Sequence, residues 1–124
     1  MDLNMKILVV DDFATTRHII KGTLKQLGLT NVAEAANGKA ALEELRKEKV
    51  DLILCDCIMP NMSGLELLKA VRSDENLKNI AFIMLPSEEK REEVIEMVRA
   101  GVNDYIVKPF TPDTLKNRIE KICG

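Results

Sequence analysis

The sequence predicts an α/β protein built on a doubly wound, flavodoxin-like sheet of five parallel strands. Short apolar runs bounded by turn residues recur five times along the 124 residues, and an amphipathic stretch of helical period follows each run. Strands that are apolar throughout, rather than alternating with polar residues, are typical of a parallel sheet covered on both faces. The resulting order βαβαβαβαβα, with right-handed crossovers, leaves few topologies for one sheet.

The first half of the chain supplies three strands and two helices. Residues 6–10 form the first strand, and the helix after it ends at Gly28, a common stop signal. One face of that helix is expected to carry Ile19, Ile20, Thr23, Leu24 and Leu27. Residues 32–35 and 52–55 form the next two strands, and the helix between them carries on one face Ala41, Leu42 and Leu45.

The second half repeats this pattern. The third helix groups Leu65, Leu68 and Val71 on one face, and residues 81–85 form the fourth strand. The fourth helix, which ends at Gly101, is expected to bury Val94, Ile95 and Val98. After the fifth strand, residues 105–107, the last helix opens with a cap, an N1 proline and a first-turn acid, which are Thr111, Pro112 and Asp113.

Length and composition narrow the class of protein. A chain of 124 residues fits one domain, residues 1–124, with no room for a second output domain. The 18 basic and 20 acidic residues are intermixed, so neither nucleic acid nor an anionic membrane is an expected partner. No apolar run approaches the ~20 residues that span a bilayer, and the N-terminus lacks the features of a secretory signal, which predicts a cytoplasmic protein.

Polar residues that follow the predicted strands carry the candidate chemistry. In an open parallel sheet the active crevice lies beyond the carboxyl ends of the strands. Asp11 and Asp12 follow the first strand, Asp56 follows the third, and Lys108 follows the fifth. Three carboxylates and one ammonium group are therefore expected at the same edge of the sheet.

The expected cluster of acids is electrostatically unfavourable unless a cation is bound. Two carboxylates ~4 Å apart at an effective dielectric of ~20 repel each other by about 4 kcal/mol, so three of them favour a cation. Mg²⁺ suits the site because it takes one or two carboxylates, keeps waters and leaves positions for phosphate oxygens. With the acids partly neutralised, one carboxylate can act as the nucleophile toward a phosphoryl group whose oxygens Lys108 also holds.

Taken one at a time, these residues have simpler explanations. Asp11 and Asp12 alone would be expected to cap the next helix, and Lys108 alone to be a solvated loop lysine. Their coincidence with Asp56 at matching strand ends favours the chemical interpretation. The cysteines form no C-x-x-C pair and are expected to remain thiols, and His18 is expected on the surface.

Three segments of the chain resemble the receiver family of response regulators, and within it the single-domain chemotaxis regulators. They are VVDDF at 9–13, LCDCIMPNMSGLELL at 54–68 and GVNDYIVKPFTPDTLK at 101–116, and the resemblance spans the whole chain. It implies the strand order 2-1-3-4-5 and a phosphorylation-dependent signalling switch of a two-component system. The implied phosphoryl donor is a sensor histidine kinase, and the implied output is a downstream protein, with a flagellar motor switch as one candidate.

The resemblance also implies a role for individual residues. Asp56 resembles the phosphoacceptor, Asp12 a direct metal ligand and Asp11 a ligand through water. Ile58 resembles the residue whose backbone carbonyl binds the metal, and Lys108 the lysine that pairs with phosphate. Such a protein is a phosphoacceptor that assists its own phosphoryl transfer and dephosphorylation, not an enzyme that turns over outside substrates.

Further implied features concern the output side of the molecule. Tyr105 resembles the aromatic switch residue, and the Lys108–Pro109 peptide is expected to be cis. The partner surface is expected on the fourth helix, the fifth strand and the fifth helix, with contacts from Lys90, Arg91, Tyr105 and Lys116. Cys57, where chemotaxis regulators carry an aromatic residue, is expected to have a raised thiol pKa beside the acids.

The sequence departs from the family pattern at the end of the fourth strand. The family places a Thr or Ser hydroxyl there to bond a phosphoryl oxygen, whereas this chain has Pro86, which offers neither a hydroxyl nor a backbone N–H. Ser87 is then either a substitute hydroxyl or the N-cap of the fourth helix. The alternative function that follows from Pro86 is a degenerate receiver, which would be a protein-interaction module without a phosphorylation switch.

Other classes with a related architecture fit less well. A flavodoxin-like electron carrier needs a hydroxyl-rich loop after the first strand and aromatic side chains around the flavin, but the chain has one tyrosine and no tryptophan. A phosphatase with an aspartyl nucleophile on the first strand ordinarily has an acid two residues after that nucleophile. Phe13 and Ala14 occupy the corresponding positions.

Overall fold

Strands and helices alternate along the whole chain in the computed structural model, which describes residues 1–124. Five parallel strands form one sheet in the order β2-β1-β3-β4-β5: β1 (Ile7–Val10), β2 (Val32–Ala35), β3 (Leu52–Asp56), β4 (Ala81–Leu85) and β5 (Asp104–Tyr105). The connecting helices are α1 (Ala14–Gln26), α2 (Gly38–Lys47), α3 (Gly64–Ser73), α4 (Arg91–Arg99) and α5 (Pro112–Cys123). The predicted fold class and strand order are confirmed. None of the helices combines the length and apolar character needed to cross a membrane.

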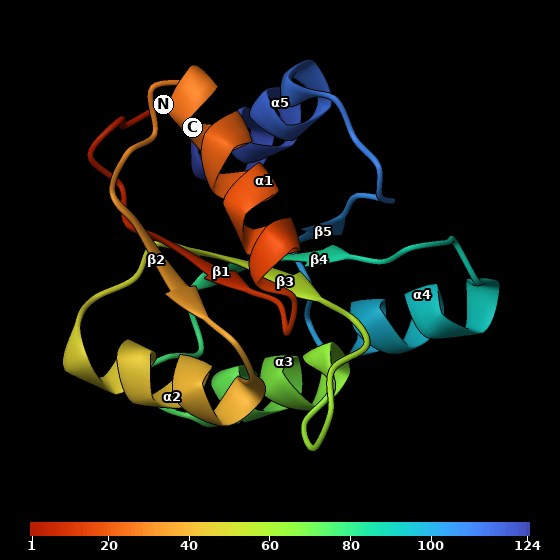
Figure 1. The fold of residues 1–124 in the computed structure, drawn as a ribbon. Helices are drawn as coiled ribbons and strands as arrows, with labels where there is room; N and C mark the ends of the chain where they lie inside the picture. Colours follow the sequence, from red (N-terminus) through yellow and green to blue (C-terminus); the bar gives the residue numbers. More distant parts are fainter.

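The sheet separates two hydrophobic layers. Helices α1 and α5 cover one face, and α2, α3 and α4 cover the other (Figure 1). Side chains alternate across the central strand, because Leu52 and Leu54 pack in the α1/α5 layer, whereas Ile53 and Cys55 pack in the layer of α2, α3 and α4. The central strands β1, β3 and β4 are buried almost throughout, as expected for a parallel sheet between two helical layers.

The predicted helix boundaries at two glycines are confirmed. Gly28 and Gly101 have φ values of 84° and 92°, in the left-handed region where glycine carries no side-chain penalty. After α1, Gly28 and Leu29 donate their backbone N–H groups to the carbonyls of Lys25 and Leu24. Hydrogen bonds of this pattern satisfy the last carbonyls of a helix and end it. At the other predicted boundary, the Thr111 side chain caps α5 and Pro112 occupies its first turn.

Two helical faces differ from the sequence prediction. Ile19 was expected to face the core but is 62% exposed, whereas Ile20 and Leu24 are buried. On α4, Ile95 and Val98 are 39% and 63% exposed, and the buried residue is Met97. The periodicity of short helices defines an apolar stripe only within about one residue, so a neighbouring apolar residue can take the core position.

Several boundaries also differ from the prediction. The first strand starts at Ile7 rather than Lys6, the third includes Asp56, and the fifth covers only Asp104–Tyr105. The alternative in which Ser87 caps α4 is wrong, because that helix begins four residues later and has Lys90 at its N-cap. Acids in its first turn supply the favourable charge at the positive end of the dipole, and they are Glu92 and Glu93.

Candidate functional site

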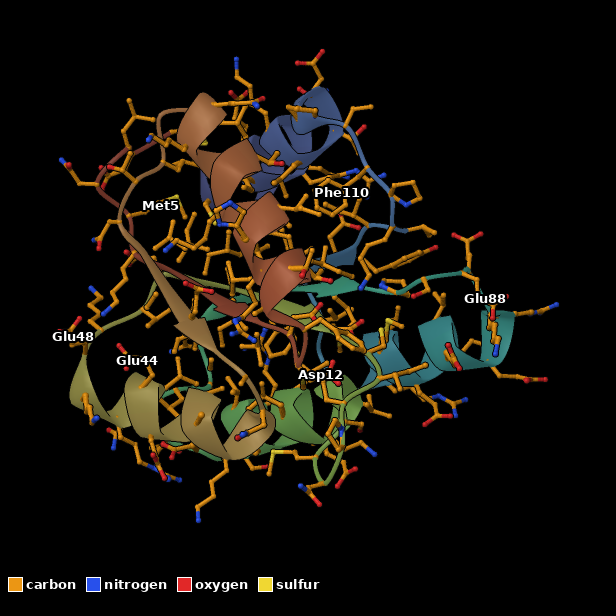
Figure 2. The ribbon with its side chains drawn as sticks, in the orientation of Figure 1. Met5, Asp12, Glu44, Glu48, Glu88 and Phe110 are labelled. Atoms are coloured by element: carbon orange, nitrogen blue, oxygen red, sulfur yellow. The ribbon has the colours of Figure 1, made fainter.

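The three predicted carboxylates converge at the carboxyl edge of the sheet. Asp11 and Asp12 directly follow β1, and Asp56 is the last residue of the adjacent strand β3. Parallel pairing of Val10 with Cys55 places Asp11 and Asp56 at neighbouring positions. One carboxylate oxygen from each of the three acids lies within 4.8 Å of the others. Figure 2 labels Asp12 near the middle of the molecule, below the start of α1, and Glu44 and Glu48 at its left edge.

Lys108 reaches these acids from the loop after β5, and the cluster of Asp11, Asp12, Asp56 and Lys108 is called the carboxylate pocket below. Its Nζ lies 3.1 Å from Oδ1 of Asp56 and 3.7 Å from Oδ2 of Asp11. Its backbone N–H donates to the carbonyl of Pro86 at 2.8 Å, which fixes the start of the loop against the end of β4. The Lys108–Pro109 peptide is cis, as predicted. The structure therefore brings the predicted ammonium group and carboxylates together.

The electrostatics of the acids favour a bound cation. Asp11 is 2% exposed, and burial raises the pKa of its carboxyl group. The backbone N–H of Phe13 and the charge of Lys108 oppose this shift, whereas the charges of Asp56 and Asp12 add to it. Oδ1 of Asp12 is buried and has no hydrogen-bond partner. An unpaired carboxylate oxygen among other carboxylates is the donor set expected for a hard divalent cation.

We expect Asp11→Asn to stabilise the metal-free protein. The raised folded-state pKa means that this carboxyl group favours folding at low pH and opposes it once the pH exceeds both the unfolded value, near 3.8, and the folded one. Asparagine keeps an oxygen for the N–H of Phe13 and removes the charge. Urea unfolding at pH 7 with a chelator is expected to show a gain of roughly 0.5–2 kcal/mol. Added Mg²⁺ is expected to stabilise the variant less than the wild type. A loss of metal-free stability would contradict this account.

The other four predicted residues contribute no side chain to the cluster of Asp11, Asp12, Asp56 and Lys108. The side chain of Ile58 is 78% exposed, so only its backbone can contribute to a metal site. Ser87 is exposed and makes no side-chain hydrogen bond, whereas Pro86 is buried. The Tyr105 hydroxyl group donates to Oε1 of Glu89 at 2.6 Å, and this hydrogen bond raises the tyrosine pKa.

Gly64 supports the pocket and was not singled out from the sequence. A Cβ at this position would lie 2.3 Å from the backbone carbonyl oxygen of Asp56. The Gly64 N–H donates to the carbonyl of Cys57, whose own N–H donates to Oδ1 of Asp56 at 2.9 Å. Ser63 and Glu66 form a capping box that starts α3 at this glycine. The S-x-x-E pattern at 63–66 was the available sequence signal.

Comparison with known proteins decides the family. The family model of the response regulator receiver domain matches residues 7–120. The chain is a receiver domain of the response regulator family. It is 52% identical to the chemotaxis protein CheY of Pseudomonas aeruginosa, over 95% of each chain. The solved structure of CheY4 from Vibrio cholerae has a TM-score of 0.89 at 35% identity, covering 96% of this chain and 98% of that one. A putative response regulator from Chloroflexus aurantiacus has a TM-score of 0.90 at 33% identity, covering 96% and 97%.

The family and its chemotaxis relatives make this receiver a phosphorylation-dependent signalling switch of the chemotaxis type. It acts as a signalling phosphoacceptor, not as a conventional enzyme. The alternative of a phosphorylation-independent interaction module gains no support from these comparisons.

Cys57 gives this receiver a thiol beside its carboxylate pocket. Its pKa is raised to about 12, first by burial and then by the negative charges of Asp56 and Glu93. The predicted direction is confirmed, but burial contributes more than the neighbouring acids that the prediction invoked. Because the thiolate is the reactive form, we expect this thiol to react slowly at neutral pH.

Proposed function

We propose that Asp56 accepts a phosphoryl group from a sensor histidine kinase, with Mg²⁺ in the carboxylate pocket, and that the phosphorylated receiver signals to a downstream protein. The observation that supports this most strongly is the pairing of Asp56 with Lys108 inside a cluster of three carboxylates. An ion pair that only stabilises the fold does not need a further acid without a partner, such as Asp12. A site that binds a cation together with a phosphoryl group does need such an acid, because its free oxygen can bind the cation.

The hydrogen bonds of Asp56 indicate which oxygen attacks. Oδ1 accepts from the backbone N–H of Cys57 and from Nζ of Lys108, whereas Oδ2 makes no hydrogen bond to the protein. Oδ2 is therefore free to form the new bond to phosphorus. The bond between phosphorus and the donor imidazole breaks, and its electron pair returns to the imidazole nitrogen. The two donors on Oδ1 hold the carboxylate in place during the transfer.

The metal ligands in this proposal come from adjacent strand ends. Asp12 and Asp56 would bind Mg²⁺ directly, Asp11 through a water, and Ile58 through its backbone carbonyl, as the resemblance implies. When bound, Mg²⁺ neutralises charge on the phosphoryl oxygens. The orphaned Oδ1 of Asp12 and the spacing of the three acids fit this donor set.

Lys108 supplies the second positive group. Its ammonium is close enough to Asp56 to pair with an oxygen of the transferred phosphoryl group after a small movement of the side chain. The hydrogen bond from its backbone N–H to Pro86 keeps the base of this side chain fixed. We propose that the same pocket also assists hydrolysis of the phosphoryl group. The same positive groups would stabilise the charge that develops when water attacks the phosphoryl group on Asp56.

We propose that residues 1–124 act as one receiver that signals through its own surface. The proposed face consists of α4, β5 and α5, with contacts from Lys90, Arg91, Tyr105 and Lys116. Tyr105 is half-buried on this face, and its hydroxyl group donates a hydrogen bond to Glu89 in the loop between β4 and α4. A flagellar motor switch is a candidate target of this face.

Phosphorylation by a small donor tests the proposal. The wild-type receiver is incubated with acetyl phosphate and either Mg²⁺ or a chelator, and the intact mass is measured. We expect one phosphoryl addition in Mg²⁺ and none with the chelator, because without the cation the acids repel the incoming phosphate. No addition in Mg²⁺, or equal addition with the chelator, would overturn the proposal.

Pro86 predicts weak coupling between Asp56 and Tyr105. A ligand shifts a conformational equilibrium only by its differential affinity for the two states, and proline offers no hydroxyl to bond the phosphoryl group in one state. Tyr105 is observed by nuclear magnetic resonance at saturating beryllofluoride and Mg²⁺. We expect Pro86→Thr to enlarge the change that this phosphoryl analogue causes at Tyr105.

A Ser87→Ala variant is the control for this experiment. Ser87 is exposed and makes no hydrogen bond, so its removal is expected to leave the response of Tyr105 unchanged. If Pro86→Thr and the wild type respond equally, and Ser87→Ala silences the wild type, Ser87 supplies the missing hydroxyl and the weak-coupling prediction is wrong.

A further inference from the structure

A small cavity beside the carboxylate pocket has three sulfur-bearing residues among the seven that line it, which also include Ile58 and Leu65. It has a volume of about 150 Å³ and lies between α3 and α4, where Cys57, Met84 and Met97 contribute to its walls. Glu93 and Glu96 of α4 also line it. The carboxylate pocket, in contrast, has only oxygen donors from its three acids. The two sites therefore differ in the chemistry that they offer to a metal ion.

The three sulfur residues of this cavity belong to three different segments of the chain: the loop after β3, strand β4 and helix α4. Around Gly64, the Sδ atom of Met84 and the Cα atom of Cys57 lie 2.8 and 3.1 Å from the position that a Cβ would take. The Met84 thioether is therefore close to the backbone of Cys57. Met97 belongs to the same hydrophobic cluster as Met84, is 4% exposed, and faces the cavity from α4.

Thiol and thioether groups are soft ligands, and in proteins they select Cu(I) over hard cations such as Mg²⁺. Single buried methionines commonly fill gaps in a core, but here one cysteine and two methionines line the same cavity, whose lining also includes two glutamates. We propose that this cavity is a Cu(I) site with Cys57, Met84 and Met97 as ligands. Binding replaces the thiol proton, so that Cys–SH and Cu⁺ give Cys–S–Cu and one released proton.

The surroundings of the cavity favour entry of a cation. Cys57 is half-buried, and Glu93 and Glu96 are exposed, so the ion reaches the sulfur atoms past two negative side chains. A bound ion would connect the residue next to Asp56 with α4. The proposal does not depend on phosphorylation, because none of its ligands is a carboxylate of the carboxylate pocket.

Competition for Cu(I) tests this inference. The receiver is titrated, without oxygen, into the coloured complex of Cu(I) with bicinchoninic acid, and loss of colour reports transfer of the ion. We expect the wild type to withdraw one equivalent and Cys57→Ser to withdraw none. Met97→Leu keeps the side-chain volume and is expected to weaken binding by at least the roughly tenfold that loss of a supporting group beside a metal costs.

Two further variants locate the site. Cys123→Ser, on the opposite side of the sheet, is expected to bind Cu(I) as the wild type does. Met84→Leu is expected to weaken binding as Met97→Leu does, and circular dichroism checks that each variant is folded. A wild type that withdraws no Cu(I), or a folded Cys57→Ser that binds equally well, would overturn the proposal. If both methionine variants bind Cu(I) as tightly as the wild type, the thioethers are not ligands and the proposed ligand set is wrong.

Discussion

Asp56→Asn is expected to abolish phosphorylation of this receiver completely. The amide nitrogen or oxygen of asparagine is a far weaker nucleophile toward phosphorus than a carboxylate, and the substitution leaves the size of the side chain unchanged. Incubation with acetyl phosphate and Mg²⁺ is expected to leave the intact mass of the variant at its starting value. The wild type is expected to gain one phosphoryl group under the same conditions.

The matched control for this experiment is Asp113→Asn. Asp113 is an exposed acid in the first turn of α5, and we expect its removal to leave the mass increase intact. The same change of charge is then made at both positions, so a difference between them reports position and not net charge. Phosphorylation of Asp56→Asn at the wild-type rate would show that another residue accepts the phosphoryl group.

Gly64→Ala is expected to be the most destabilising single-methyl substitution near the pocket. Its Cβ would lie 2.3 Å from the carbonyl oxygen of Asp56 and 2.8 Å from Sδ of Met84, so the backbone of β3 or α3 has to move. We expect a loss of about 3 kcal/mol in the free energy of unfolding, at the upper end of the usual cost of overpacking. The phosphorylation rate is expected to fall as well, because the displaced backbone carries Asp56.

Gly22→Ala provides the control for the glycine substitution. Gly22 lies inside α1, and no neighbouring side-chain atom or more distant backbone atom lies within 4 Å of the position that its Cβ would occupy. Alanine is preferred over glycine inside a helix by roughly 0.5–1 kcal/mol, so this variant is expected to be more stable than the wild type. Urea unfolding measures both variants. If Gly64→Ala matches the wild type in stability and rate, the close approach at Asp56 carries no cost.

The order of elements was predictable because its signals are local. Apolar runs, glycine stops and the Thr111 cap each depend on a few neighbouring residues, and the structure confirms them. The orientation of short helices was less predictable. Whether Met97 or Val98 faces the core depends on how α4 lies against the sheet, which no local pattern specifies. The brief strand β5 likewise depends on pairing with β4.

The grouping of the site was predictable, but its support was not. The carboxyl ends of parallel strands meet at one edge, and this rule alone brings Asp11, Asp56 and Lys108 together. The rule gives no information on backbone hydrogen bonds. The contact of Gly64 with the carbonyl of Asp56, and the bond from Lys108 to Pro86, arise where loops pack together in three dimensions.

The distribution of the site over three strands of one sheet has a consequence for immature or damaged chains. Asp56 is separated from Asp11 and from Lys108 by more than a third of the chain each, and only the pairing of β1, β3, β4 and β5 brings the three residues together. A nascent chain that has not yet produced β5 lacks the ammonium group, and a chain in which β1 has come away from β3 lacks two of the acids. Under the proposed function, an incomplete copy lacks part of its phosphorylation site, so we expect partially synthesised or proteolysed receiver not to signal.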